Sequence, residues 1–292
     1  MPNLKEVRDR IESVRSTQQI TSAMKLVSAA KLRRGQEAIQ KIRPYANKLH
    51  QILGDLSQNT EDLEDEEYTH PRDPEKILLL IISSNRGLCG AFNSHIIKFT
   101  HKIISENYQK QYDHGNLQMM FFGKKAAEHF KRRQYPIFDI NTEIFDALSF
   151  ENVAPMAEHF MKLFSGKKFD RIDIVYNKFK NASVQEPTHE QFLPFQAPEK
   201  EESGLIPDYI FEPGIMDMVK QLIPKTLKIQ LYKALLDSSA SEHGARMTAM
   251  HKATDNAQEL LKDLKLSYNK ARQAAITNEL IEIVSGANAL NE

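Results

Sequence analysis

The strongest local candidate for chemistry is a glycine-containing turn that follows an apolar run. Residues Lys76–Ser83 read KILLLIIS, which is typical of a buried parallel strand, and Asn85–Phe92 read NRGLCGAF. A strand, a glycine turn and the N-terminus of a helix together form an arrangement that binds phosphate. This turn matches neither GxGxxG nor GxxxxGK[S/T], so the pattern favours a tight turn that packs a helix on a strand. A nucleotide-dependent α/β enzyme remains an alternative interpretation.

The other reactive side chains form no recognisable catalytic or metal site. Cys89 is the only cysteine, which excludes an intramolecular disulfide, and a lone cysteine is more often a small buried residue than a nucleophile. The ten histidines show no HExxH spacing. His243 and His251 are too far apart along one helix to bind one ion, so we predict that both face solvent. We therefore expect no catalytic residue, no metal and no cofactor.

The composition indicates a protein with balanced charge and one or two domains. Among 292 residues, 39 Lys and Arg balance 39 Asp and Glu, so the net charge gives no general preference for nucleic acid or membrane. No apolar run approaches the roughly 18 residues that a membrane span needs. The N-terminus enters a helical pattern without a signal or transit peptide. We expect a soluble protein in a reducing compartment that stays where it is made.

Proline placement divides the chain. Of the 12 prolines, only Pro2 and Pro44 lie outside residues 71–224, and proline breaks helix interiors. The sequence therefore predicts four parts: an N-terminal coiled-coil helix (1–57), an acidic linker (58–75), a central α/β domain (76–215) and a C-terminal coiled-coil helix (216–292).

The C-terminal arm carries a heptad repeat. If residues 226–286 form one helix, it is roughly 90 Å long at 1.5 Å per residue, so it must project or be covered by other chains. Its end is rich in apolar residues, which suggests burial on more than one side. The seam residues are Met247, Met250, Thr254, Ala257, Leu261, Leu264, Tyr268, Ala271 and Ala275, and the apolar end comprises Leu280, Ile281, Ile283 and Val284.

The N-terminal arm is also predicted to be a coiled-coil helix, and it is basic. Its heptad begins at Leu4, Val7, Ile11 and Val14, slips by one residue through Gln18 and Gln19, and resumes at Ile20, Met24 and Val27. Residues 1–50 hold 11 Lys and Arg against four acids. This charge is consistent with a solvated face, with an acidic protein partner or with nucleic acid. The balanced C-terminal arm, with nine basic and eight acidic residues from residue 225, counts against nucleic acid.

The middle of the chain alternates strand and helix patterns. This alternation predicts a small Rossmann-like α/β domain with a largely parallel sheet. An edge strand is expected at Ser183–Phe195, and a loop at Gln196–Pro213. Further strands are expected at Leu117–Phe122, Tyr135–Ile140 and Arg171–Asn177, and helices at Asn93–Gln109, Lys124–Arg133 and Asn152–Phe164.

Several stretches resemble the γ subunits of bacterial F-type ATP synthases, and the resemblance covers essentially the whole chain. The C-terminal stretch Ile276–Ala289 (ITNELIEIVSGANA) fits the γ signature at every constrained position. Three further stretches are similar: Ile20–Lys31 (ITSAMKLVSAAK), Ser84–Asn93 (SNRGLCGAFN) and Ala245–Asn256 (ARMTAMHKATDN). The resemblance implies a non-catalytic rotor shaft, in which the two arms form an antiparallel coiled coil inside a hexamer of α and β subunits.

The resemblance also implies partners and residue roles. Arg272 and Gln273 match positions that hydrogen-bond a β-subunit loop, and Thr277 and Glu282 match nearby positions implicated in coupling. Met24 and Lys25 match a segment that faces an acidic lever of the β subunit. The segment Leu280–Val284 would act as a bearing, and the central domain would bind the ε subunit and the membrane c-ring. These expectations place the protein at the cytoplasmic side of a bacterial inner membrane, peripheral to it, with no nucleic-acid partner. A single cysteine excludes the disulfide switch of chloroplast γ chains, and the acidic linker has no counterpart in the family pattern.

Overall fold

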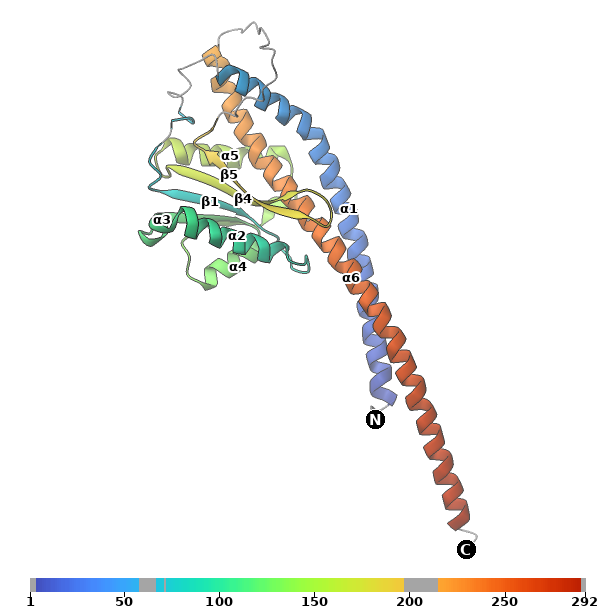
Figure 1. Ribbon diagram of the computed structural model, residues 1–292. Helices are drawn as coiled ribbons and strands as arrows, with labels where there is room; N and C mark the ends of the chain where they lie inside the picture. The colour runs from blue at the N-terminus through green and yellow to red at the C-terminus, as the bar shows by residue number, and fades with distance from the viewer. Residues whose placement is uncertain (1–3, 58–66, 71, 197–214, 290–292) are drawn as a thin grey trace. The chain divides into compact units, whose positions relative to one another are not determined.

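A computed structural model describes residues 4–57, 67–70, 72–196 and 215–289 (Figure 1). The chain forms two compact units, one from Met1–Ser28 with Met247–Glu292 and the other from Ala29–Arg246. Two long helices, α1 (Leu4–Ser57) and α6 (Ile215–Ala289), contribute to both units. Most of the acidic linker, and all of the predicted loop Gln196–Pro213 except Gln196, lie outside the described residues.

The larger unit is built on a five-stranded sheet with the order β3-β2-β1-β4-β5. The strands are β1 (Ile77–Ile82), β2 (Leu117–Phe122), β3 (Ile137–Asn141), β4 (Arg171–Phe179) and β5 (Gln185–Leu193). All neighbours pair in parallel except β4 and β5, which are antiparallel. The central strand β1 is buried at every residue, which explains its continuous apolar sequence. The predicted α/β fold with a largely parallel sheet and an edge strand is confirmed.

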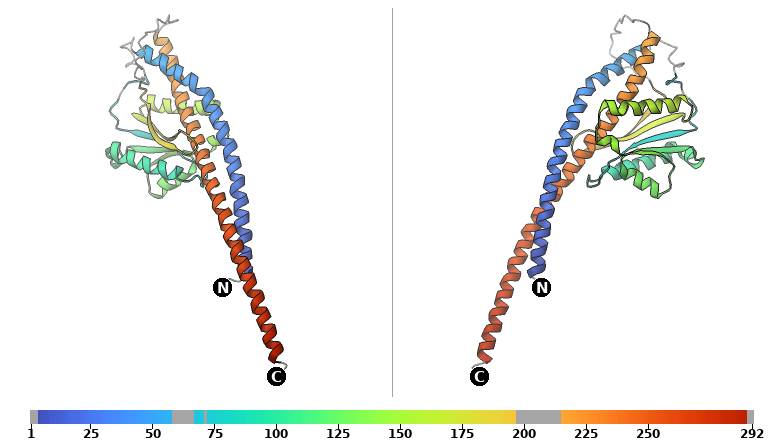
Figure 2. Two further views of the ribbon diagram at one scale, coloured as in Figure 1. Left: turned by 45° about the vertical axis from the view of Figure 1, so that its right-hand side comes forward. Right: turned by 180° about the vertical axis from the view of Figure 1, so that it is seen from behind.

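Helices cover both faces of this sheet (Figure 2). One face packs on α2 (Phe92–Asn107), α3 (Gln109–Asp113) and α4 (Lys124–Arg132). The other packs on α5 (Phe150–Ser165) and on the first part of α6, through residues such as Phe160, Leu227 and Leu231. A short 3-10 helix, η2 (Glu143–Phe145), precedes α5. The sequence prediction missed α3 and η2.

Each of the two long helices contains a proline. The helix α6 continues through Pro224 and begins at Ile215, nine residues before that proline. The helix α1 likewise remains helical through Pro44.

Within the larger unit the two helices approach closely at Gly35, where an added Cβ would lie 3.3 Å from the Ala240 Cβ. A glycine at this crossing lets the backbones come together.

The smaller unit contains an antiparallel pairing of α1 with α6. Thr21 lies opposite Thr254 and Lys25 opposite His251, so residue numbers rise along one helix as they fall along the other. The buried residues Val7, Met250, Ala257 and Leu261 follow the predicted heptads. Ala275 is exposed, so the α6 seam ends before it.

The predicted heptad slip in α1 is wrong. Ile20 and Val27, which the prediction placed in the seam, are 57% and 59% exposed, whereas Thr21 and Ser28 are 9% and 3% exposed. The seven-residue spacing therefore continues without a slip through Val14, Thr21 and Ser28. Polar residues occupy the seam here because each has a hydrogen-bond partner.

Candidate interaction surface

Two polar contacts join α1 to α6 in the smaller unit, and a third hydroxyl of the seam bonds within α1. The hydroxyl oxygens of Thr21 and Thr254 lie 2.9 Å apart, and Lys25 Nζ lies 3.3 Å from His251 Nδ1. The Ser28 hydroxyl donates to the carbonyl of Met24 at 2.8 Å. Buried hydroxyls with partners cost little and specify which residues stand opposite one another. Lys25, a residue expected to meet a partner subunit, is thus also a contact within the coiled coil.

A row of exposed apolar side chains runs along α1 beside this seam. Ile20, Ala23, Met24 and Val27 follow helical spacing; Met24 is half-buried and the other three are exposed. Exposed β-branched residues at this spacing form a surface that another chain can cover. Sequence reasoning named Met24 but assigned Ile20 and Val27 to the seam, because their apolar character alone does not tell which face they occupy.

The C-terminal segment of α6 carries the other residues expected to bind partners. Arg272, Gln273, Thr277 and Glu282 are all exposed. The Thr277 hydroxyl donates to the carbonyl of Gln273 at 2.9 Å, which ties these two positions to one turn of helix. Arg272 lies 21 residues from His251, so this group is about 30 Å along the helix from the Lys25 contact. The structure therefore separates the expected partner residues into two groups.

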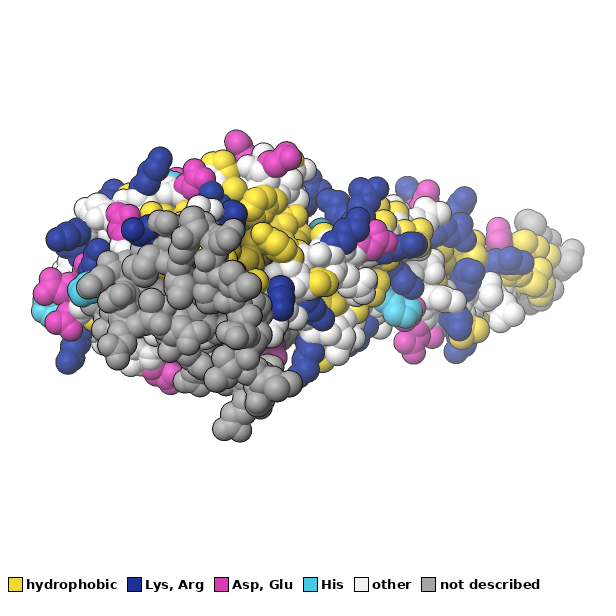
Figure 3. Space-filling model, turned by 90° about the horizontal axis from the view of Figure 1, so that it is seen from above, with side chains coloured by type: hydrophobic (Ala, Val, Ile, Leu, Met, Phe, Trp, Pro, Cys, Tyr) yellow, Lys and Arg dark blue, Asp and Glu magenta, His cyan; other side chains and the backbone are white. Residues whose placement is uncertain are grey.

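The apolar end of α6 is exposed throughout. Leu280, Ile281, Ile283 and Val284 are 57%, 58%, 62% and 57% exposed, and hydrophobic side chains gather at this end (Figure 3). At 100° per residue these four positions, with Ile276, span an arc of about 160°. The remaining arc carries Asn278, Glu279, Glu282 and Ser285. The sequence suggested that this end of the helix is apolar on more than one side. The structure shows one broad apolar face, with a polar face opposite.

The glycine turn of the α/β domain is in contact with α6. Arg246 donates to the carbonyl oxygens of Arg86 at 3.1 Å and of Gly87 at 3.3 Å, and it pairs with Glu242 at 2.7 Å. Ala245 packs against Cys89 and Phe92. Nucleotides in open α/β sheets bind at the carboxyl ends of the strands, near such a turn. Here that position is filled by a helix of the same chain, which supports the interpretation of the turn as a packing element.

Burial shifts the pKa values of the ionisable side chains around this turn. Cys89 is 1% exposed, and burial raises the pKa of its thiol, so it has little thiolate character. Burial also raises the pKa of Glu242, against the opposing effect of Arg246. Burial, with the neighbouring charges of Arg246 and Lys31, lowers the pKa of His243 to about 4. The prediction that His243 faces solvent is therefore wrong, whereas His251 is exposed as predicted.

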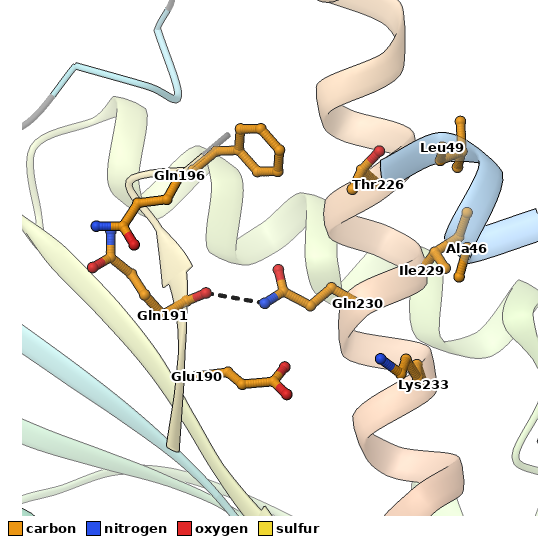
Figure 4. Close-up of a pocket in the computed structure, with 10 residues that line it drawn as sticks. Ala46, Leu49, Glu190, Gln191, Gln196, Thr226, Ile229, Gln230 and Lys233 are labelled. Carbon is orange, nitrogen blue, oxygen red and sulfur yellow. Dashed lines mark hydrogen bonds between the residues drawn. The ribbon is translucent and has the colours of Figure 1, made fainter. Parts of the chain in front are cut away.

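A cavity of about 300 Å³ lies in the larger unit between β5 and the helices α1 and α6 (Figure 4). Glu190 and Lys233 point toward one another from its two sides, and Gln230 donates to the carbonyl of Gln191 at 3.0 Å. Thr226, which also lines the cavity, is 3% exposed, and its hydroxyl has no hydrogen-bond partner among the residues that the structure describes. An unpartnered buried hydroxyl costs stability.

Within the described parts of the chain, no three side chains of the metal-binding types come together. No helix of these parts is long and apolar enough to cross a membrane.

Comparisons with known proteins identify related chains over the full length. A family profile described as ATP synthase matches residues 3–290. The ATP synthase gamma chain of Christiangramia forsetii is 55% identical over 291 residues and covers 100% of both chains. The ATP synthase gamma chain of Cytophaga hutchinsonii is 49% identical, again over 100% of both chains.

Solved structures with a similar fold come from mitochondrial ATP synthases. A chain of the Euglena gracilis OSCP/F1/c-ring assembly in rotational state 3 aligns with a TM-score of 0.66 at 22% identity, over 98% of this chain and 94% of that one. A chain of the Euglena gracilis rotor in rotational state 1 aligns with a TM-score of 0.63 at 20% identity, over 94% and 98%. These likenesses confirm the fold class: long N- and C-terminal helices and a central α/β domain.

Proposed function

Because this chain belongs to the ATP synthase gamma-chain family, we propose that it is the central-stalk rotor subunit of an F-type ATP synthase. In this role it couples proton-driven rotation of the membrane c-ring to conformational cycling of the catalytic β subunits. Its partners are the α and β subunits, the ε subunit and the c-ring. The chain itself contributes no catalytic group and acts only through contacts.

The observation that carries this proposal is the exposed apolar face at the end of α6. Leu280, Ile281, Ile283 and Val284 each leave more than half of their surface to solvent. At about 25 cal/mol per Å² of apolar surface, covering such a face is strongly favourable. A surrounding ring of subunits would cover it while leaving the helix free to turn, so we assign Leu280–Val284 as the bearing.

The coupling follows from differential contact. A shaft that presents different faces to three β subunits stabilises a different conformation in each, and rotation changes which subunit is stabilised. We assign Arg272 and Gln273 to a hydrogen-bonded contact with a β-subunit loop, and Thr277 and Glu282 to the adjoining turns. All four side chains are exposed, as such contacts require.

We assign Met24 and Lys25 to the contact with an acidic segment of the β subunit. Met24 belongs to the exposed apolar row of α1, and the first 50 residues carry a large excess of basic residues. Residues 1–57 and 216–292 act as the arms of the shaft, 58–75 as a linker, and 76–215 as the domain that meets the ε subunit and the c-ring. The protein is then held at the inner membrane only through its complex, on the cytoplasmic side.

The assignment of Arg272 and Gln273 is tested by the double variant Arg272→Ala, Gln273→Ala in the assembled complex. Loss of charge-assisted hydrogen bonds should lower the rate of coupled ATP synthesis at least about threefold. The variant should still assemble, because both side chains are exposed. Lys262→Ala, an exposed change on the same helix, serves as the control and should leave the rate unchanged. Wild-type synthesis by the double variant would refute the assignment.

A further inference from the structure

A cluster of nitrogen donors lies between α2 and α4, on the sheet face opposite to α6 (Figure 1). His101 Nε2 lies 3.3 Å from His129 Nε2 and 3.0 Å from Arg133 Nη1. His101 comes from α2 and His129 from α4. Arg133 is the residue directly after the end of α4. Three nitrogen atoms thus converge on one point at the surface of the domain.

The position of His101 is fixed by its neighbours. Its ring lies 4.8 Å from that of Phe130, and its Nδ1 lies 3.3 Å from the Tyr135 hydroxyl. Since Arg133 can only donate, His101 Nε2 accepts and its proton is on Nδ1, where it is shared with Tyr135. One imidazole lone pair therefore faces two donors, the Arg133 guanidinium and the His129 ring. Donors outnumber acceptors at this point.

The charges around the cluster are positive. The pKa of His101 is lowered by burial and then by Arg133 and His129. The pKa of His129 is lowered by burial and then by Arg133 and Arg132. In the described residues no carboxylate lies within 4 Å of either arginine, and the nearby Glu128 pairs with Lys125 at 3.0 Å. Tyr135, which contacts His101, and Tyr112, stacked on Tyr135, are further ionisable neighbours. An anion is the component that would complete this cluster.

We propose that His101, His129 and Arg133 form a binding site for a tetrahedral oxyanion, a phosphate or sulfate group. When the group binds, Arg133 turns its N–H from the imidazole to an anion oxygen, and protonated His101 and His129 each donate an Nε2–H to it. Charge-assisted hydrogen bonds of this kind are about twice as strong as neutral ones. The group could be a free ion or the phosphate of a lipid headgroup. The site is independent of the proposed contacts with the β subunit.

A metal ion fits this cluster less well. The separation of the two Nε2 atoms would suit two ligands of tetrahedral zinc. However, the Arg133 guanidinium lies against one of these atoms, and Arg132 adds a second positive charge. A divalent cation would be repelled by both arginines, whereas an oxyanion would be attracted by them.

The test is a calorimetric titration of the full-length chain with sulfate, which remains dianionic over the pH range used. Because both histidines must be protonated, sulfate should bind at least about fiftyfold more tightly at pH 6.0 than at pH 7.5. Arg133→Gln, an exposed change, and the double variant His101→Gln, His129→Gln should each abolish binding. His114→Gln, a change at an exposed histidine elsewhere in the domain, is the matched control and should bind as the wild type does.

A second experiment distinguishes a free ion from a lipid headgroup as the source of the oxyanion. Phosphatidylcholine vesicles with and without phosphatidic acid are tested for binding to the same proteins. Binding that requires phosphatidic acid and Arg133 supports the site with a headgroup as its ligand, and sulfate binding alone supports it with a free ion. The proposal would be overturned if the chain bound neither sulfate nor the vesicles with phosphatidic acid, or if Arg133→Gln kept the binding. Histidine-dependent binding of zinc in place of sulfate would also overturn it.

Discussion

Thr21 of α1 and Thr254 of α6 meet across the coiled coil, with their hydroxyl oxygens 2.9 Å apart. Thr21 also lies within hydrogen-bond distance of the Gln18 carbonyl, and Thr254 within that of the Met250 carbonyl. Each hydroxyl therefore keeps a local partner if the other is removed. Together with the contact of Lys25 with His251, this pair fixes the register of two helices that otherwise pack through apolar seam residues such as Met250 and Leu261.

Replacing either threonine by valine tests this pair. The double-mutant cycle of Thr21→Val and Thr254→Val should show a coupling free energy of about 0.5–1 kcal/mol, because valine keeps the shape and the cycle cancels the loss of the local bonds to Gln18 and Met250, which leaves the shared hydrogen bond. Urea unfolding of the full-length chain measures it. Thr17→Val, at an exposed threonine with only a local bond to Ser13, should have little effect. Strictly additive effects of the two valines would show that the hydroxyls do not interact in solution.

Leu261 and Leu266 on α6 distinguish the seam from the outer face of the coiled coil. Leu261 is 8% exposed and Leu266 is 61% exposed. Leu261→Asp should reduce the free energy of unfolding by about 2–5 kcal/mol, since it buries a charge and removes packing. Leu266→Asp should change it by less than about 0.5 kcal/mol. Thermal melts followed by circular dichroism compare the two, and equal losses would mean that this seam is wrongly assigned.

His243 should make the larger unit sensitive to acid. Its pKa in the folded protein is about 4, below the ordinary value of 6.5, so the unfolded chain binds its proton first as the pH falls. The stability that the neutral imidazole contributes is therefore full above pH 6.5 and is lost between pH 6.5 and 4, by up to about 3 kcal/mol. His243→Gln should lose less stability than the wild type between pH 7 and pH 4.5 in urea titrations.

The control for this experiment is His95→Gln, at an exposed histidine of α2. Its pH profile should follow that of the wild type. Parallel profiles for His243→Gln and the wild type would contradict the assigned cause of the acid sensitivity.

Thr226 should be a site where removing a polar group stabilises the protein. Its hydroxyl is buried without a hydrogen-bond partner in the described parts of the chain, so Thr226→Val should raise the free energy of unfolding by about 1 kcal/mol. Thr100 on α2 is the matched control: it is also buried, but its hydroxyl donates to the Ile96 carbonyl at 2.8 Å. Thr100→Val should lower stability or leave it unchanged. The opposite order of the two variants would indicate that a water molecule or another group binds Thr226.

Helices and strands were predicted best where residues close together in the sequence determine which side chains are buried. Leu117–Phe122 was predicted as a strand with the observed bounds, because an apolar run between turn residues has few other solutions. The seam of α1 was predicted less well. Ile20 and Thr21 are neighbours, and apolar character favoured Ile20, yet Thr21 faces α6 because Thr254 stands opposite it. That choice depends on a residue 233 positions away, which local patterns do not reveal.

The candidate surface shows the same limit. The apolar character of the end of α6 was predicted, since its apolar residues follow one another closely in the sequence. The C-terminal helix was predicted from residue 216, and α6 begins at Ile215, where packing of Val219 and Ile223 stabilises the helix before Pro224. The cluster of His101, His129 and Arg133 was missed, because it requires α2 and α4 to lie side by side.

Native mass spectrometry of the assembled complex tests the central claim most directly. The full-length chain is expressed with the α and β subunits from the same source, and the main peak of a sizing column is weighed and assayed for ATP hydrolysis. The rotor assignment predicts one copy of this chain per three α and three β subunits, and activity that depends on its presence. A chain that elutes alone and leaves the activity unchanged would contradict the assignment.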